Sequence, residues 1–456
     1  MLKCRFILMT LAMMSLAINP SALLGIAQGG CAITVQSGQS IQQAIDGAAK
    51  EAVICLAAGT FLENLTIDKS ITLQGAGEDA TILDGNQNGR VVTIASAGNA
   101  VKVTLSDITI QNGSAESGGG ISNEPVFGTY PSPALTLARV TISGNTASQV
   151  GGGIYNNATL TLADATISGN SAPQGGGVFN SGTATLTRVI IRENFAQHGG
   201  GIYNQGKMGL IDVVIHGNSV PDTLETQGSA GGISNFGSVG FPDSGKMTLA
   251  NVTVSENSAF SVAGISNILG SMTLVNVTIS GNRASHAIGA IFNGDQNGQG
   301  VAAMVLINVT ISGNISPPGS HAGIAHGATS AKSPMVLKNV ILANNGDENC
   351  SNYQNKKTNI TSLGHNLSSD STCAKFFRGS GDLNDTDPKL DPGGLKDNGG
   401  FTQTIALLQG SPAIDAVPLG ACKDQSNTPQ PIATDQRGIA RPQGKACDIG
   451  AFELTR

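Results

Sequence analysis

The chain lacks tryptophan and is poor in aromatic and charged residues, which excludes several kinds of protein. Of its 456 residues, 4% are aromatic and 12% are charged, well below the roughly one quarter charged residues of ordinary globular proteins. A core built on large aromatic side chains is therefore excluded. The net charge of −6 comes without a basic patch or an acidic tail, which argues against nucleic acid or an anionic membrane as partner. The excess of glycine, 61 residues, instead favours an extracellular β protein built from small residues.

Long apolar runs are also missing, except at the N-terminus. Residues 1–27 combine a basic start at Lys3 and Arg5, an apolar run from Phe6 to Ile18, and small residues up to Ala27. This is the pattern of a secretory signal peptide, and we expect cleavage after Ala27. No other stretch reaches the ~18 apolar residues that a membrane-spanning helix needs. The sequence therefore predicts an exported mature chain without a transmembrane segment.

Cysteine usage agrees with export. Six cysteines remain after Cys4 is removed with the signal peptide, and an even number in an oxidising compartment predicts disulfides. The sequence alone does not fix their connectivity. Because the cysteines fall into three local pairs, we expect the disulfides Cys31–Cys55, Cys350–Cys373 and Cys422–Cys447.

A repeated motif, Val-Thr-Ile-Ser-Gly-Asn, organises the middle of the chain. Val140, Ala165 and Val189 begin three successive copies, at steps of 25 and 24 residues, and longer steps elsewhere contain inserted loops. A period in this range is typical of a solenoid. Each unit contains three short segments of alternating apolar and polar residues, which predict three short strands separated by turns. Strands this short leave no room for crossover helices, so the sequence predicts an all-β fold, a parallel β-helix.

Equivalent positions of successive units carry matching residues, as expected if the coils stack in register. The position before the Val-Thr-Ile segment alternates in charge and then becomes asparagine: Asp107, Arg139, Asp164, Arg188, Asp212, Asn251, Asn276, Asn308 and Asn339. Two inward columns contain leucine (from Leu137 to Leu337) and methionine (from Met208 to Met335), and another asparagine column runs from Asn123 to Asn293. Stacked polar residues of this kind satisfy one another along the axis.

The glycine triplets, such as Gly151 to Gly153, hold a fixed phase to these columns. Glycine adopts positive φ and leaves room where backbones approach closely. The triplets are therefore expected to form the corner that each coil must turn.

These repeats resemble those of polymorphic outer membrane proteins, over about Asp107 to Asn345, a likeness carried by copies of ISGNTASQVGGGIYN. The resemblance implies a right-handed β-helix. The earlier part, Ile33 to Ile110, is similar to the start of pectin methylesterase and pectate-lyase-like β-helices, and Ser40 to Asp46 predicts a short capping helix with Ser40 as N-cap. No catalytic residues of those enzymes carry over to this chain.

The segment from Cys350 to Glu453 resembles the choice-of-anchor domain of type Q, through TSLGHNLSSDSTC, GDLNDTDPKLDP and ATDQRGIARPQGKACDIGAFE. In that family the segment commonly precedes a surface-sorting signal, and none follows here, so we expect free secretion or non-covalent association with the surface. The expected organisation is a signal peptide (1–27), a cap with the first coils (28–106), the repeats (107–349) and a disulfide-stapled, irregular C-terminal region (350–456).

Candidate catalytic residues interrupt an outward column of serines. Arg192 and His216 occupy equivalent positions of adjacent units, with Glu193 beside them. A base and a group that neutralises a uronate carboxylate are what polysaccharide lyases need. Exposed charged residues at a turn are more often simply solvated, so these three are weak candidates.

Two further sets are candidates for ligands. An aromatic residue precedes the ladder asparagine at Tyr155, Phe179, Tyr203 and Phe292, a stripe that either binds sugar rings or is buried in the wall. Asp382, Asn384, Asp385 and Asp387 place four oxygen side chains within six residues, which favours calcium or, more commonly, a plain turn. Asp435 and Arg437 are expected to form a local ion pair that stabilises the C-terminal region.

Two functions remain open. The first is a non-catalytic, secreted or cell-surface protein that binds polysaccharide or other cell-envelope material, and the second is a lyase or epimerase acting on uronate-rich polymers. The scarcity of carboxylates and aromatic residues on the repeats favours the first, because sugar-cleaving sites usually gather both. No cofactor is predicted apart from the calcium of the candidate loop.

Overall fold

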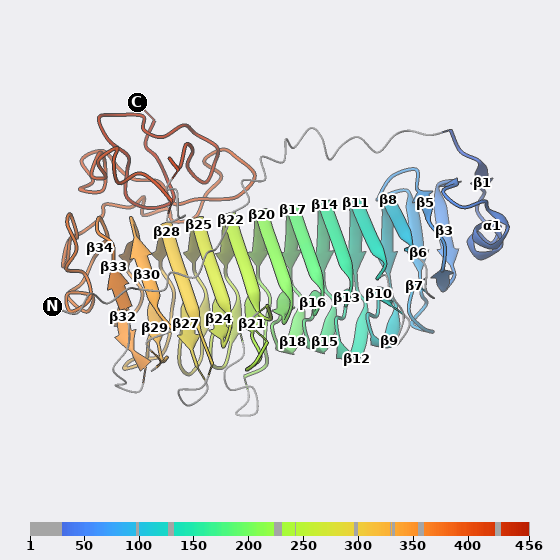
Figure 1. The fold of residues 1–456 in the computed structure, drawn as a ribbon, viewed down its shortest axis with the longest axis horizontal. Coiled ribbons are helices and arrows are strands. Elements are labelled where there is room, and N and C mark those ends of the chain that lie inside the picture. The colour runs from blue at the N-terminus through green and yellow to red at the C-terminus, as the bar shows by residue number, and fades with distance from the viewer. Residues whose placement is uncertain are drawn as a thin grey trace.

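The chain forms a parallel β-helix, in which strands of successive coils pair in parallel along one axis (Figure 1). The computed structural model describes residues 30–96, 100–125, 132–222, 230–241, 243–295, 300–328, 330, 333–353, 360–424 and 430–455. The predicted fold class is confirmed. The expected signal peptide, residues 1–27, lies outside the described residues.

The largest sheet, sheet A, differs from the expectation in one respect, because two of the three predicted strands of each coil are joined. A single residue with positive φ, such as Arg139 (52°) or Asp164 (53°), bends the chain, and the residues on either side of it pair with the next coil. We call the residues before this bend the first limb and those after it the second limb. The joined strands are β8 (Lys102–Gln111), β11 (Ala134–Ser143), β14 (Thr159–Ser168), β17 (Thr183–Arg192), β20 (Lys207–His216), β22 (Lys246–Ser255), β25 (Ser271–Ser280) and β28 (Ala303–Ser312).

At the ends of sheet A the two limbs remain separate strands. These are β1 (Ile33–Val35), β2 (Val53–Leu56), β3 (Gly59–Leu62), β5 (Ile71–Gln74), β6 (Thr81–Asp84), β30 (Met335–Lys338), β31 (Ile341–Ala343), β33 (Ile360–Ser362) and β34 (Leu367–Ser368).

Sheet B forms the opposite wall of the coils. Its strands are β4 (Leu65–Ile67), β7 (Val92–Ser96), β10 (Ile121–Pro125), β13 (Ile154–Asn156), β16 (Val178–Asn180), β19 (Ile202–Asn204), β21 (Ile233–Phe236), β24 (Ile265–Ile268), β27 (Ile291–Gly294), β29 (Ile324–His326) and β32 (Cys350–Asn352). Short strands between sheets A and B are β9 (Ser114–Ser117), β12 (Thr146–Val150), β15 (Ser171–Gln174), β18 (Phe195–His198), β23 (Ser258–Ala259) and β26 (Arg283–Ala284).

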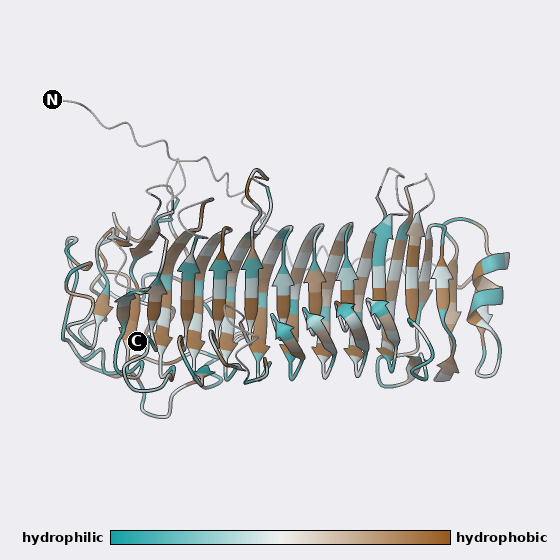
Figure 2. Ribbon diagram, turned by 90° about the horizontal axis from the view of Figure 1, so that it is seen from below, coloured by the Kyte–Doolittle hydropathy of each residue, from teal (hydrophilic) through white to brown (hydrophobic). Residues whose placement is uncertain are grey.

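The core lies inside the coils and consists of the predicted columns. Met208 pairs in register with Met247, and Leu210 with Leu249, and the leucine and methionine columns are buried along their whole length. Alternation of hydrophobic and hydrophilic residues along each strand repeats from coil to coil (Figure 2). The burial of aliphatic side chains drives the stacking, and no large aromatic core is needed.

Asparagine ladders satisfy the polar groups at the coil corners. In the predicted ladder, Asn156 Nδ2 donates to Asn180 Oδ1 at 2.6 Å, and Asn180 donates to Asn204 at 2.7 Å. A ladder that the sequence analysis missed uses the asparagine of each Ser-Gly-Asn, where Asn170 donates to Asn194 at 3.0 Å. Both ladders are buried, so each asparagine completes hydrogen bonds that water cannot supply.

The charged column lies at the bend of sheet A, and its residues pair as expected. Arg188 makes two hydrogen bonds of 2.6 Å to Asp164, and Asn251 donates to Asp212 at 3.0 Å. Burial raises the pKa of Asp212, while Asn251 and Arg188 oppose that rise. All residues of the column have positive φ, which asparagine and aspartate tolerate better than most residues.

The glycine triplets form the expected corners. Gly151 and Gly175 have φ of 65° and 63°, and a Cβ on Gly175 would lie 2.5 Å from the carbonyl oxygen of Val178. Neither the backbone conformation nor the close approach of the next residues leaves space for a side chain.

Both ends of the stack are closed. Helix α1 (Ile41–Gly47) covers the first coil with the buried Ile41 and Ile45, and Ser40 caps it by accepting from the N–H of Gln43. At the other end, Cys373 and Phe377 join the same core. The three expected disulfides, Cys31–Cys55, Cys350–Cys373 and Cys422–Cys447, are all present.

The rest of the C-terminal region folds back along sheet A and lies over the last coils (Figure 1). It packs against Ile341 and Ala343 through an apolar cluster that includes Val417 and Ile449. The expected ion pair of Asp435 and Arg437 is formed, at 2.7 Å, and is buried. No helix in the described part of the chain is long and apolar enough to cross a membrane.

Candidate functional site

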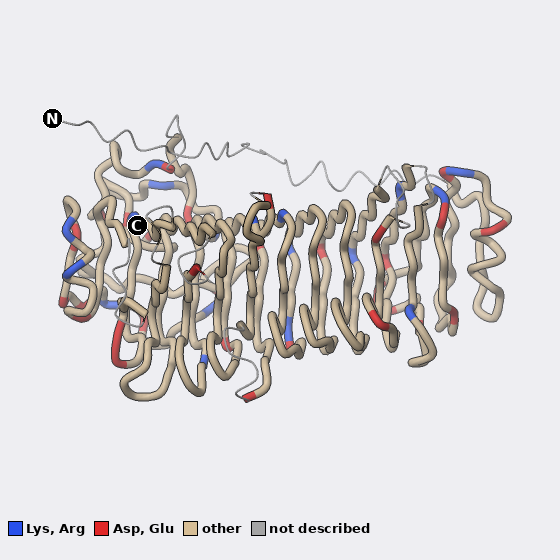
Figure 3. Tube along the Cα trace, turned by 60° about the horizontal axis from the view of Figure 1, so that its bottom comes forward, with Lys and Arg blue, Asp and Glu red and all other residues tan. Residues whose placement is uncertain are grey.

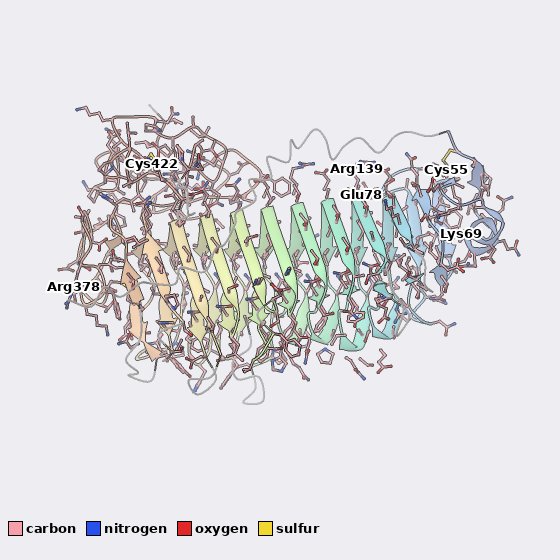
Figure 4. All side chains as sticks on the ribbon, in the orientation of Figure 1. Cys55, Lys69, Glu78, Arg139, Arg378 and Cys422 are labelled. Atoms are coloured by element: carbon pink, nitrogen blue, oxygen red, sulfur yellow. A yellow bond between two sulfur atoms is a disulfide. The ribbon has the colours of Figure 1, made fainter. Side chains whose placement is uncertain are left out.

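The second limb of sheet A is covered at both ends and open between them. At the N-terminal end Glu78, in the loop after β5, accepts hydrogen bonds from the hydroxyls of Thr109 and Thr141, and Figure 4 shows Glu78 and Arg139 at the same edge of the sheet. At the C-terminal end the hydroxyl of Thr253 donates to the carbonyl oxygen of Gln403 at 2.6 Å. The second limbs of β14, β17 and β20 lie between these contacts, and we call their outer surface the shelf.

The shelf combines apolar and polar side chains in register. Its central column is Thr166, Ile190 and Val214, all partly exposed. The charged column at the bend borders one side. On the other side lie Arg192 and His216, which pair in register as the sequence predicts.

The three candidate catalytic residues are thus brought together, at the exposed edge of the shelf. Arg192 Nη1 lies 2.9 Å from Glu193 Oε2, and the two side chains are 43% and 62% exposed. His216 Nδ1 is 3.3 Å from the hydroxyl of Ser255. The side chain of His216 is 39% exposed, so water rather than a desolvated pocket surrounds these groups.

Sequence analysis missed a fourth member of this group, Glu256. Its carboxylate lies 3.9 Å from His216 Nε2. Glu193 and Glu256 stand where most coils have the glycine of Ser-Gly-Asn, and they keep the positive φ of that position, 57° and 53°. A glutamate that replaces a glycine in a strained corner was a readable signal in the sequence.

The aromatic stripe is only partly continuous. Tyr155, Phe179 and Tyr203 stack along sheet B, with ring centroids 5.7 and 5.4 Å apart, whereas two serine-bearing coils separate Phe292 from them. Phe292 packs instead against Tyr353. Because Tyr155 and Tyr203 cover both faces of the buried Phe179, the stack presents ring edges and two tyrosine hydroxyls. Burial raises the pKa of both tyrosines.

Three of the four candidate calcium ligands, Asp382, Asn384 and Asp387, make side-chain hydrogen bonds to different partners. Asp382 accepts hydrogen bonds from Ser362, Asn366 and the N–H of Gly379. Asn384 donates to a carbonyl, and Asp387 accepts from the N–H of Lys389. Within the described residues, no group of three or more histidine, cysteine or acidic side chains could hold a metal ion.

Comparisons with known proteins show a similarity in fold and a match to one repeat. The family model of the Chlamydia polymorphic membrane protein (Chlamydia_PMP) repeat matches residues 139–157, which make up most of one coil, from the bend of β11 to the end of β13. No curated protein sequence matches the chain.

Several solved structures are similar in fold. The pectate lyase Pel9A has 13% sequence identity and a TM-score of 0.45, with 93% of this chain and 96% of that chain covered. The A-module of the Azotobacter vinelandii mannuronan C-5 epimerase AlgE6 has 16% identity and a TM-score of 0.40, with coverage of 72% and 94%. A mannuronic acid specific polysaccharide family 6 lyase from human gut microbiota has 11% identity and a TM-score of 0.35, with coverage of 75% and 88%. At these identities the likeness concerns the β-helix fold alone.

Proposed function

We propose that the chain is an exported, non-catalytic β-helix protein that binds polysaccharide at or near the cell surface. The predicted signal peptide and the three disulfides support export, because disulfides persist in oxidising compartments. The shelf supports binding, since it is the part of the second limb that neither Glu78 nor the C-terminal region covers.

The observation that carries the proposal is the pairing of Arg192 and His216 beside Ile190 and Val214. Sugars present hydroxyl groups next to apolar C–H surfaces, so their binding sites combine hydrogen-bonding side chains with apolar ones. Arg192 and His216 would supply the hydrogen bonds, and Ile190 and Val214 the apolar contact. Apart from these two residues and the charged column at the bend, few residues of the central coils are charged (Figure 3).

Affinity electrophoresis through gels containing acidic or neutral polysaccharides tests the proposal. We expect at least one polymer to retard the mature protein and the double variant Arg192→Ala/His216→Ala to lose most of that retardation. The double variant Arg283→Ala/His286→Ala removes an exposed arginine and an exposed histidine outside the shelf. It is the matched control and should behave as the unmodified protein. Free migration through every gel would refute polysaccharide binding.

A second candidate function is a lyase or epimerase on uronate-rich polymers. It is favoured by the position of His216, 3.9 Å from Glu256 and next to Arg192, because a base beside a guanidinium could remove the proton next to a carboxylate that the guanidinium neutralises. Proton NMR of uronate polymers incubated with the protein and calcium distinguishes the two functions. New unsaturated or epimerised residues that disappear in His216→Ala would establish catalysis, and unchanged polymer would leave binding.

A further inference from the structure

Threonines on the outer face of sheet A form two columns, and the chain uses one of them to hold its own C-terminal region. On the second limb the hydroxyl of Thr278 donates to Gln436 Oε1 at 2.7 Å, and that of Thr310 accepts from the N–H of Ala451 at 3.0 Å. Thr253, Thr278 and Thr310 are all buried by this contact. A column of threonines on this solenoid is thus a surface that docks a polar, uncharged chain through hydroxyl groups.

The other column, on the first limb, has no such partner. It runs in register through seven threonines, with Gly209 between the fifth and the sixth: Thr72, Thr104, Thr136, Thr161, Thr185, Thr248 and Thr273. Thr273 is buried, and the other six lie at the surface. All six are partly or fully exposed. Within the described residues, none of their hydroxyls makes a hydrogen bond. We call this surface the threonine face.

The backbone makes the threonine face a regular array. Parallel coils place successive hydroxyls about 4.8 Å apart along the axis, and residues i and i+2 of one strand about 6.6 Å apart. Thr159 and Thr183, both exposed, widen the array at β14 and β17. Because β-branched side chains have few rotamers, each position presents one hydroxyl and one methyl group in a fixed direction.

The threonine face is also uncharged at its centre. Charged residues border this column on both sides. Lys102, Lys207 and Lys246 lie two residues before it, where Lys207 and Lys246 share Asp243 at 3.6 and 2.7 Å, and the charged column at the bend lies three residues after it. The threonine column itself offers no counterions, so a charged group bound over it would lose hydration without compensation. The face suits a neutral chain that can both donate and accept hydrogen bonds.

We infer that the threonine face binds a neutral, extended polysaccharide lying along the coil axis. The inference rests on the proposed function, and it adds a second surface and a substrate class to it. Sugar hydroxyls donate and accept, as threonine hydroxyls do, and the threonine methyls contact the C–H surfaces of the sugar rings. A sugar residue in an extended chain is about as long as the coil spacing, so successive residues meet successive threonines.

The triple variant Thr136→Val/Thr161→Val/Thr185→Val tests this inference, because valine keeps the shape and the strand preference of threonine and removes only the hydroxyl. The probe is a soluble, unbranched neutral β-glucan, and the measurement is its Kd from affinity electrophoresis. Loss of three hydrogen bonds should raise that Kd about tenfold or more. Thr146→Val, an exposed threonine of β12 that lies outside both the threonine face and the shelf, is the matched control and should leave the Kd unchanged.

The outcomes separate this inference from the proposed function. Weaker glucan binding by the triple variant, with unchanged thermal unfolding, supports the threonine face. Equal binding by the triple variant, or retardation by polygalacturonate alone that depends on Arg192 and His216, overturns the inference and leaves the proposed function standing. The absence of retardation by any polymer overturns both.

Discussion

The asparagine ladder of the Ser-Gly-Asn corners should be a main source of stability, and Asn194→Ala measures it. Asn194 Oδ1 accepts from the backbone N–H and from Nδ2 of Asn170, both at 3.0 Å. Its Nδ2 donates to the carbonyl oxygen of Ile167 at 3.0 Å and to Asn218 Oδ1 at 2.9 Å. Alanine removes all four hydrogen bonds in a place that water does not reach.

Four buried hydrogen bonds at about 1 kcal/mol each predict a loss of about 4 kcal/mol in the free energy of unfolding. Urea denaturation of the mature protein, followed by circular dichroism, measures this loss at constant m-value. Asn157→Ala is the matched control, since Asn157 is exposed and should cost less than about 0.5 kcal/mol. A loss below about 1 kcal/mol for Asn194→Ala would refute the reasoning, because the ladder would then contribute no more than one exposed hydrogen bond.

Three further substitutions test other columns. Asp164→Arg removes the partner of Arg188 and places three positive charges in a row, so it should lower stability by about 1 kcal/mol, seen as a lower Tm. His326→Asn should reduce acid sensitivity, because burial lowers the pKa of His326 below its usual 6.5, so that the native state loses stability as pH falls through that value. Gly175→Ala should cost more than about 1 kcal/mol, since its φ of 63° and the nearby Val178 carbonyl exclude a Cβ.

Each of these substitutions has a control and a contradicting result. Ser168→Arg adds a positive charge outside the charged column, and an equal drop in Tm would argue against pairing along that column. His286→Asn replaces an exposed histidine, so the Tm difference between pH 8 and pH 5 should shrink only in His326→Asn. Gly420→Ala has no atom within 4 Å of the added Cβ, and a similar cost at Gly175 and Gly420 would contradict the corner geometry.

The sequence predicted the stacking of the coils because matching residues pair with one another. The repeats predicted the leucine and methionine columns, the alternating charges and one asparagine ladder. In a solenoid whose coils stack in register, equivalent residues of successive repeats lie next to one another, so a residue type that recurs at one position predicts a column. The joined strands could not, because Arg139 and Asp164 look like turn residues and only the structure shows that one bent residue leaves the pairing intact. The Ser-Gly-Asn ladder was missed because its asparagines were read as turn residues.

The candidate site was predicted less completely, because the repeats relate only residues that lie one repeat apart in the sequence. Arg192 and His216 were placed as neighbours, because they lie one repeat apart. The sequence did not predict where the shelf ends, because Thr253 and Gln403, whose contact marks that end, are 150 residues apart in sequence and no repeat relates them. The sequence did not single out the threonine face, because threonine is common in strands for its shape alone. Only the structure shows that, in the described part of the chain, threonines of the second limb bond to the C-terminal region, whereas those of the first limb do not.

The closed ends of the coil stack have a consequence for any polymer that binds along it. Helix α1 at one end and Phe377 at the other prevent further coils from adding. The number of coils, and with it the length of polymer that one molecule can contact, is therefore fixed. The affinity for an oligosaccharide should therefore increase with each added sugar until the oligosaccharide is as long as the coil stack. Further sugars should then leave the affinity unchanged. On a longer polymer, additional protein molecules would bind side by side, each occupying the same length of chain.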